Sequence, residues 1–180
     1  MIRYHLEAFR ATGLAAIMAA IVTLPAAHAA PPNPATATLN VQANVVEICK
    51  VAVSADVDFG DIDNPEANDD ANGTIQWRCS PGTSGSVSLD AGLHESTPND
   101  VTTRRMKDAG VNHIPYQLYT SNAYATIWGD GNNSSVTQPV LGTGIGDTGD
   151  LTVFGRIPAN AASDKPLGPY SDQVQVNLDF

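Results

Sequence analysis

The stretch YSDQVQVNLDF, Tyr170–Phe180, alternates polar and apolar side chains. Val174, Val176, Leu178 and Phe180 share one face of an extended chain, and polar or acidic residues occupy the other face. This period of two residues predicts a half-buried β-strand. The given sequence stops on this strand, so we expect no hairpin partner after it. One of its edges is then left open to pairing with another chain.

A second alternating stretch, ATATLNVQANV, lies near the other end of the sequence and is the most regular of all. Its apolar face consists of Ala35, Ala37, Leu39, Val41, Ala43 and Val45. At Val45-Val46 the phase slips by one residue, which sends the following side chains to the opposite face. We therefore expect two strands joined end to end, with different roles.

The remaining sequence consists of short strand patterns separated by turn-forming residues. Strands are predicted near Val51–Val53, around Val57–Phe59, and within TIQWRCS, GSVSLDAG, IPYQLYTS, TIWGDG and LTVFGRIP. Stretches such as NPEANDDANG and GTGIGDTGD separate them. No window of useful length keeps a helical period. This spacing of strands and turns predicts an all-β sandwich that forms a single domain.

The first residues have the pattern of an export signal. Arg3 and Arg10 precede an apolar run from Leu14 to Leu24, and Ala27-His28-Ala29 fits a small-x-small cleavage site. We therefore predict a secretory signal peptide over residues 1–29. No other segment is apolar enough to cross a bilayer, so we expect no membrane span in the mature protein.

The mature chain of about 150 residues is long enough for one domain with a hydrophobic core. It keeps 7 basic and 18 acidic residues after removal of the signal peptide. An acidic surface repels phosphate, so nucleic acid and anionic membranes are excluded as partners.

Cys49 and Cys79 are the two cysteines of the chain. Export brings them into an oxidising compartment, where such a pair closes into a disulfide. In the chain-entropy model, closing a loop of this length stabilises the fold by roughly 3–4 kcal/mol. The two residues are too far apart for C-x-x-C redox chemistry, and no neighbouring histidine completes a zinc site.

Catalytic and cofactor chemistry have little support in the sequence. The mature chain contains only His94 and His113, neither near a nucleophile motif, so we expect no catalytic residues. Gly144–Gly149 matches G-x-G-x-x-G, but a strand pattern follows it where the dinucleotide motif requires a helix. We expect no cofactor and no metal site, although the carboxylate-rich stretch from Asp56 to Asp70 leaves calcium open, without the EF-hand spacing.

An aromatic group offers a further alternative. Tyr119, Tyr124 and Trp128 lie close together in sequence, beside Asp130 and several asparagines. Such residues can stack on sugars and bind their hydroxyls, or they can simply pack within a pair of strands. The sequence favours packing and leaves a carbohydrate-binding module as an alternative.

Several of these stretches together resemble one known family. VVEICKVAVSADVDFGDID, TIQWRCS, YQLYTSNAYATIWGDG, LTVFGRIP and YSDQVQVNLDF occur in this order and are similar to the spore coat protein U-like domain, which includes pilins of archaic chaperone–usher pili of the Csu type. The resemblance covers the chain from about Ala35 to Phe180. It implies an incomplete immunoglobulin-like β-sandwich that is completed by donor-strand complementation, in which another chain supplies the missing strand.

The resemblance also implies a domain plan. Residues 30–45 are expected to be an N-terminal leader and donor strand, whose apolar side chains enter a neighbour's groove. Residues 46–180 are expected to be the pilin domain, and Val174, Val176, Leu178 and Phe180 to border its acceptor groove and contact the chaperone.

The expected partners are identical or related subunits, a periplasmic chaperone and an outer-membrane usher. The protein would pass through the periplasm to a pilus on the cell surface and support adhesion and biofilm formation. A spore or cell-surface coat protein of the same family is an alternative destination.

Overall fold

The computed structural model describes residues 34–180. The predicted signal peptide, residues 1–29, and the first residues of the predicted leader lie outside this range. Residues 34–42 form one unit and residues 43–180 form another, and each is considered by itself. Residues 34–48 have no assigned secondary structure, so the strand predicted over Ala35–Val45 is not formed in this single chain.

The folded unit is built from β-strands and one turn of 3-10 helix. In chain order they are β1 (Cys49–Ala55), β2 (Asp69–Cys79), β3 (Ser84–Leu89), η1 (Val101–Thr103), β4 (Arg105–Lys107), β5 (His113–Pro115), β6 (Gln117–Tyr119), β7 (Gln138–Leu141), β8 (Gly149–Ile157) and β9 (Val176–Asp179). Over residues 34–180, no helix is long and apolar enough to cross a membrane. The predicted all-β fold class is confirmed.

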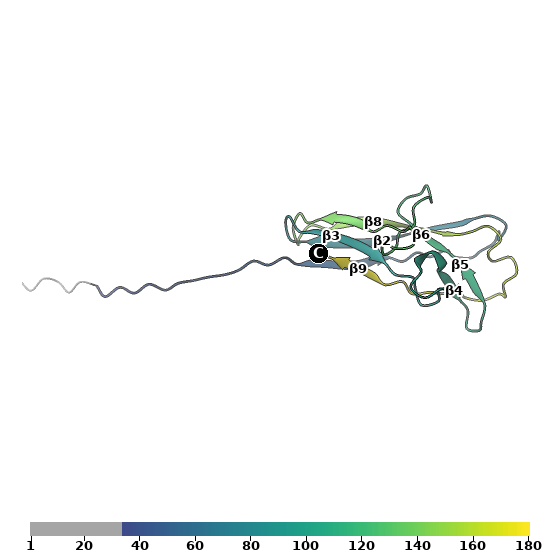
Figure 1. Cartoon of the computed structure of the whole chain (residues 1–180), viewed down its shortest axis with the longest axis horizontal. Helices are drawn as coiled ribbons and strands as arrows, with labels where there is room; N and C mark the ends of the chain where they lie inside the picture. Colours follow the sequence, from purple (N-terminus) through teal and green to yellow (C-terminus); the bar gives the residue numbers. More distant parts are fainter. Residues whose placement is uncertain (1–33) are drawn as a thin grey trace, which may run out of the picture. The chain divides into compact units, whose positions relative to one another are not determined.

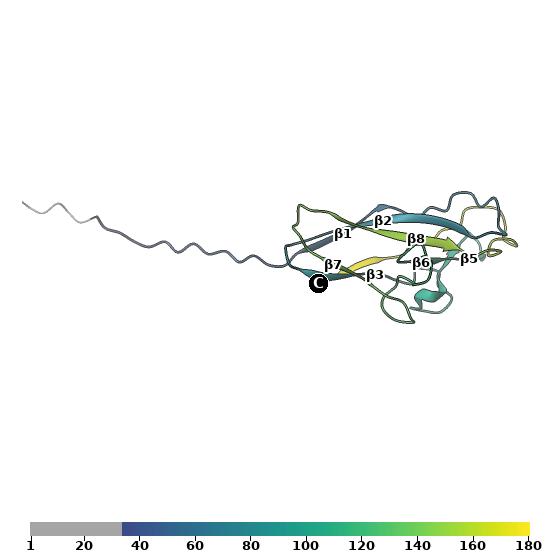
Figure 2. The ribbon, with the colours of Figure 1, turned by 90° about the horizontal axis from the view of Figure 1, so that it is seen from above.

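The strands form two layers. The first sheet has the order β1-β2-β8-β6, and the second has the order β7-β3-β9. All of their pairings are antiparallel. Figures 1 and 2 show the two sheets lying over one another, with the small β4–β5 hairpin at the end opposite the C-terminus.

The core fills the space between the sheets. It contains side chains from both layers, chiefly Ile75, Val87, Leu89, Leu118, Trp128, Val153 and Ile157, each less than a tenth exposed. Within β3 and β8 the buried residues occupy alternate positions, as expected where one face of a strand is buried and the other is not, whereas Trp128 lies outside the strands.

A buried arginine ties the loops to the sheets at one end. Arg104 is 1% exposed, and its guanidinium has no carboxylate partner. It donates instead to the carbonyl oxygens of Leu89, Asp90 and Trp128 and to Oε1 of Gln117, at distances from 2.6 to 3.1 Å. Burial lowers the pKa of Arg104. Every side of the charge is hydrogen-bonded, which is the condition for tolerating it in the interior.

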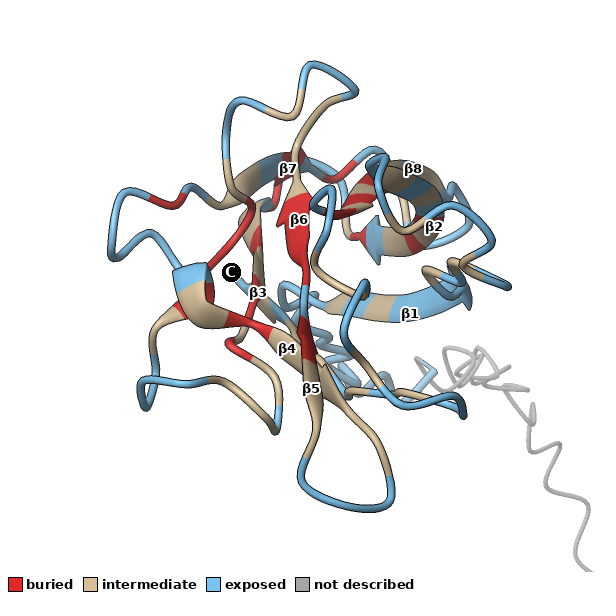
Figure 3. Cartoon of the chain, turned by 90° about the vertical axis from the view of Figure 1, so that its right-hand side faces the viewer, coloured by how far each residue is buried: buried red, intermediate tan, exposed pale blue. Residues whose placement is uncertain are grey.

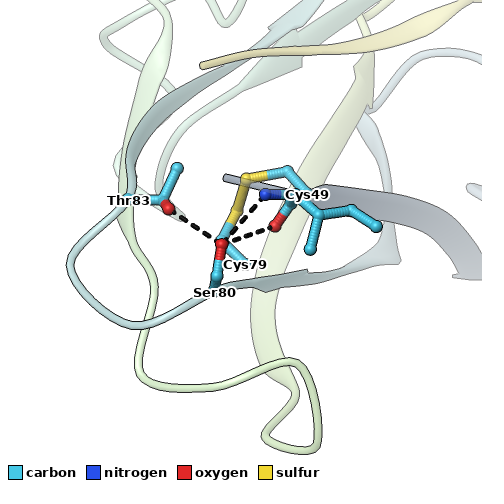
Figure 4. Close-up of a disulfide and its surroundings, with 5 residues drawn as sticks. Cys49, Cys79, Ser80 and Thr83 are labelled. Atoms are coloured by element: carbon cyan, nitrogen blue, oxygen red, sulfur yellow. Dashed lines mark hydrogen bonds between the residues drawn. A yellow bond between two sulfur atoms is a disulfide. The ribbon is translucent and has the colours of Figure 1, made fainter. Parts of the chain in front are cut away.

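Cys49 and Cys79 form the predicted disulfide. The bond joins the first residue of β1 to the last residue of β2, which face each other across the strand pair with Cα atoms 4.1 Å apart. It fixes one end of the pairing between these two strands (Figure 4).

Three predictions of local structure are wrong. TIWGDG was predicted as a strand, but only Ile127 and Trp128 take part in isolated bridges there. The other two lie around β2, and one contact explains both. The Asn72-Gly73 pair was predicted to lie in a turn, but β2 runs through it from Asp69. Val57 to Phe59, a predicted strand, is instead an unpaired segment packed inward on the sheet. A Cβ at Gly73 would lie 2.8 Å from Cγ2 of Val57, so the missing side chain is what lets the two segments meet.

We predict that Arg104→Met lowers the free energy of unfolding by about 3 kcal/mol or more, because several buried acceptors lose their donor at once. Urea unfolding followed by tryptophan fluorescence would measure this, since Trp128 is fully buried. Arg156→Met is the matched control. It removes the surface ion pair with Asp70, at 2.6 Å, and the contact of the guanidinium with the Tyr124 ring, so its effect should stay at about 1–2 kcal/mol. Equal losses in the two variants would contradict the role given to Arg104.

Candidate functional site

The outer strands β1 and β9 belong to different sheets and lie in contact with each other without pairing. β1 pairs only with β2, and β9 pairs only with β3, within residues 34–180. Figure 3 shows β1 as largely exposed, whereas β6 is mostly buried. The sandwich is therefore open along the line where these two edges face each other.

A cavity of about 1190 Å³ opens where the end of β1, at Val53 and Ala55, lies near the start of β9, at Val176, and loop residues within 56–62 and 162–172 complete its lining. Its floor is the core itself, since Ile75, Leu89 and Val153 line it. Its rim includes Val53, which is 50% exposed, and the half-buried Val176. We call this cavity the groove. Its floor is apolar and would be covered if one more strand lay between β1 and β9, whereas its walls also carry charged side chains, among them Asp56, Lys165 and Asp172.

Backbone groups along both rims also lack partners. Asp90 N donates to Gln175 O at 3.1 Å, and Gln175 N donates to Oδ1 of Asp90 at 2.8 Å. Gln175 therefore faces β3. Successive residues of a strand point their N–H and C=O groups to opposite sides. The groups of Val176 and Leu178 accordingly point away from β3, toward the open edge.

The same reasoning applies to β1. Ser80 N donates to Ile48 O at 2.9 Å, so Ile48 faces β2. By alternation, the backbone groups of Cys49, Val51 and Val53 face outward. Unpaired backbone donors and acceptors beside an apolar floor are what an added strand would satisfy.

The other sheet edges are protected. β7 carries Pro139, which has no N–H to offer, and β6 spans only three residues. β1 has seven residues and no proline. Proteins commonly blunt their free edges by such devices, so the two unprotected edges at the groove stand out as an interaction site.

Two carboxylates hold the C-terminal segment in register. Asp172 accepts from the Tyr116 hydroxyl at 2.7 Å and from Leu93 N at 2.9 Å. Asp90 accepts from Gln175 N, as described above. Burial, followed by the hydrogen bond to Asp172, raises the pKa of Tyr116. These contacts fix which side chains of the segment turn toward the groove.

The predicted acceptor residues differ in how closely they border the groove. Val174 and Val176 line the groove, and Leu178 packs against the core beside them. Phe180 is 58% exposed. The sequence reasoning missed the floor residues and the segment around Val57 and Phe59. Alternation within TIQWRCS offered a signal for Ile75, but nothing local indicated Val57 and Phe59.

The predicted donor residues are all exposed. Ala35, Ala37, Leu39 and Val41 lie in the unit of residues 34–42, and Ala43 and Val45 begin the folded unit. Leu39 is 85% exposed and Val41 is 86% exposed.

The aromatic residues do not form a shared surface for a sugar. Trp128 is fully buried, and its Nε1 donates to Val87 O at 3.0 Å. The Tyr124 ring is covered by the guanidinium of Arg156, 3.6 Å from its centroid. The alternative in which these side chains pack is therefore the one observed. Across residues 34–180, no three His, Cys, Asp or Glu side chains gather closely enough to hold a metal ion.

Three comparisons relate this chain to known proteins. A profile of the Spore Coat Protein U domain matches residues 35–177. "Protein U" of Myxococcus xanthus is 29% identical over 181 residues, which cover 94% of this chain and 97% of that protein.

Among solved structures, the chain is similar to the CsuC–CsuE chaperone–tip adhesion subunit pre-assembly complex from archaic chaperone–usher Csu pili of Acinetobacter baumannii. The TM-score is 0.51 and the identity 24%, over 76% of this chain. This chain spans 40% of the length of that one, and the likeness is one of fold.

We predict that Tyr116→Phe loosens the C-terminal segment, since Asp172 loses one of its two donors. Amide hydrogen exchange at Gln175 and Asn177, whose backbone groups face β3, should accelerate by about tenfold, the equivalent of one net hydrogen bond of about 1–1.5 kcal/mol. Tyr170→Phe is the control, because its hydroxyl bonds only the exposed carbonyl of Pro166. Unchanged exchange in Tyr116→Phe would contradict the anchoring role.

The same variant should alter stability at high pH. The folded pKa of Tyr116 lies above its ordinary value of 10.0, so the fold favours the protonated form. Its contribution is fully present below pH 10 and is lost as the pH rises, because the unfolded tyrosine then ionises. Urea titrations between pH 8 and 11 should show a shallower loss of stability in Tyr116→Phe than in the unaltered chain.

Proposed function

This chain belongs to the Spore Coat Protein U domain family, whose members are structural proteins and not enzymes, and on that premise we propose that it is a subunit of a surface pilus. In this proposal, residues 30–45 of one subunit enter the groove of the next as a donor strand. Residues 46–180 form the pilin domain that receives it. Residues 1–29 direct export.

The open groove is the observation that carries the proposal. It combines an apolar floor with unpaired backbone groups on both rims, so it selects for an extended chain in place of a small ligand. Each backbone hydrogen bond to an added strand contributes about 0.5–1.5 kcal/mol net. An apolar side chain placed on the floor adds about 1.5–3 kcal/mol.

The segment Ala35–Val45 has the properties that such a groove requires. Its apolar side chains recur at every second residue, and it carries no charge. Leu39 and Val41 are its largest apolar side chains and are almost fully exposed, so their burial would supply most of the apolar gain. A donor and a groove on the same chain give a head-to-tail contact that does not close, and the product is a filament.

A periplasmic chaperone and an outer-membrane usher complete the proposal. The exposed groove would need protection between export and assembly, and a chaperone strand fits the same two rims. The similar solved structure is itself a chaperone–subunit complex, which supports this route. The assembled fibre would lie on the cell surface and support adhesion and biofilm formation.

A coat on spores or cells is the second candidate. The match to "Protein U" covers nearly the full length of both chains, which favours a protein of the same extent and plan. The assembly chemistry would be the same, and only the destination would differ.

The first test is deletion of residues 30–45. The unaltered chain, assembled with its chaperone and usher, should give a ladder of multimers on an unheated SDS gel, because donor-strand polymers dissociate very slowly. The deletion variant should give no ladder but should still bind a synthetic peptide of residues 35–45. Polymerisation by the deletion variant would show that the donor lies elsewhere.

Peptides with single substitutions supply the control. Leu39→Asp places a carboxylate on the apolar face and should weaken peptide binding by at least about a hundredfold, since a buried unpaired charge is costly. Asn40→Asp places the same group on the opposite face and should change binding by less than about fivefold. Equal effects would contradict the assigned phase.

A second test removes residues 176–180. Without β9, the groove loses one rim and Leu89 loses its strand partner Val176. We expect this variant to escape capture by the chaperone and to be degraded in the periplasm. Accumulation of a stable chaperone complex at the normal level would contradict the assignment of β9 as a groove rim.

A further inference from the structure

We propose that the junction Val46–Ile48, together with Ser80, prevents the donor segment from folding back into the groove of its own subunit. We call these residues the junction lock. The proposal rests on the proposed function and deepens it. In this proposal, the junction lock makes the donor segment insert into a neighbouring subunit in preference to its own.

Some part of the molecule must disfavour insertion of the donor segment into its own groove relative to insertion into a neighbour's groove. A strand tethered a few residues from its own groove would compete at an effective concentration of about millimolar, if the tether could reach. Free subunits compete at micromolar concentrations or below, so self-insertion would win by a factor of about a thousand. A subunit that polymerises must therefore make self-insertion costly.

Ile48 is held by Ser80 on both of its backbone groups. Ile48 N donates to Oγ of Ser80 at 2.9 Å, and Ser80 N donates to Ile48 O at 2.9 Å. The Ser80 hydroxyl is also within 3.1 Å of Oγ1 of Thr83, which is 1% exposed. Figure 4 shows this group directly beside the Cys49–Cys79 disulfide. The strand pairing is thus extended one residue beyond the disulfide, and Ile48 is committed to β2.

Self-insertion would require the chain to reverse at this place. The first residue of β1 whose backbone groups face the groove is Cys49. A hairpin that closes there must use Ile48 as a turn residue and break its bonds to Ser80. A hairpin closing two residues earlier must use Val45 and Val46 as its turn.

The residues that would have to form either of these hairpin turns are poorly suited to it. Two-residue hairpin turns need positive φ, which is why glycine, asparagine and aspartate dominate them. Positive φ is strongly unfavourable for β-branched residues. Val45, Val46 and Ile48 are all β-branched, and the structure assigns no turn or bend to residues 43–48. The junction therefore favours continuing outward over reversing.

The experiment inserts a flexible pentapeptide, Gly-Asn-Gly-Gly-Ser, between Val46 and Glu47. The insertion allows a reversal that leaves Ile48 on Ser80. We expect a shift of about a hundredfold or more from multimers to SDS-resistant monomers at micromolar chain concentration. The monomer fraction should not change on dilution, and Leu39 should become protected from proteolysis within it.

A stiff insertion of equal length, Pro-Thr-Pro-Thr-Pro, is the matched control, because an extended proline-rich segment cannot reverse. This variant should still form the ladder. In a second pair, Ser80→Ala in the chain without an insertion should raise the monomer fraction by up to about fivefold, through loss of the hydrogen bond to Ile48 N. Ser54→Ala, which removes an exposed hydroxyl of β1 that bonds Thr74 O on β2, should leave it unchanged.

Two results would overturn the junction lock. One is a flexible-insertion chain that polymerises as fully as the unaltered chain. The other is an unaltered chain that is already a closed monomer. If the chain lacking residues 30–45 also fails to bind the peptide of residues 35–45, the proposed function fails together with the lock. If that peptide binds while the flexible insertion still polymerises, only the lock fails.

Discussion

The structure depends on one unmet requirement, which is strand pairing along the facing edges of β1 and β9. Backbone N–H and C=O groups must be hydrogen-bonded when they are removed from water. At the groove, two rows of such groups border an apolar floor that reaches the buried core. Water can satisfy the backbone groups, but it cannot satisfy the floor. An additional strand would satisfy both, and no strand of residues 43–180 occupies this position.

A sandwich with an open side needs support from elsewhere, which hydrogen bonds provide at one end and a disulfide at the other. At one end, Arg104 donates to backbone carbonyls of two segments, at Leu89–Asp90 and at Trp128, and Asp172 and Tyr116 hold the chain that leads into β9. At the other end, the Cys49–Cys79 disulfide secures β1 to β2. Arg104 and the disulfide lie outside the lining of the groove, whereas Tyr116 and Asp172 form part of it, so the rims are held in place while the groove stays open.

The distribution of protection over the sheet edges agrees with this picture. Pro139 blocks the outer edge of β7, and β6 is too short to offer a long edge. In the two main sheets of residues 43–180, β1 and β9 are the edge strands without such a block, although the pairing of β1 shifts register at Val53–Ala55, and these two strands lie in contact. An edge left open by default invites random association. In this fold the open strand edges lie at the groove. The depth of the groove and the register of its two strands restrict which chains can pair there.

Sequence by itself determined the local features, because each depends on neighbours along the chain. Alternation in Tyr170–Phe180 predicted the last strand and its inward face, the turn residues predicted an all-β fold, and the cysteine count with an export signal predicted the disulfide. Tertiary structure alone decided the rest. Asn72-Gly73 has turn chemistry but lies within β2, because Val57 packs where a side chain would stand. Burial of Arg104 and Trp128, and the floor of the groove, arise from contacts between segments far apart in sequence. A local pattern records which face of a strand is apolar, but only packing decides what that face meets.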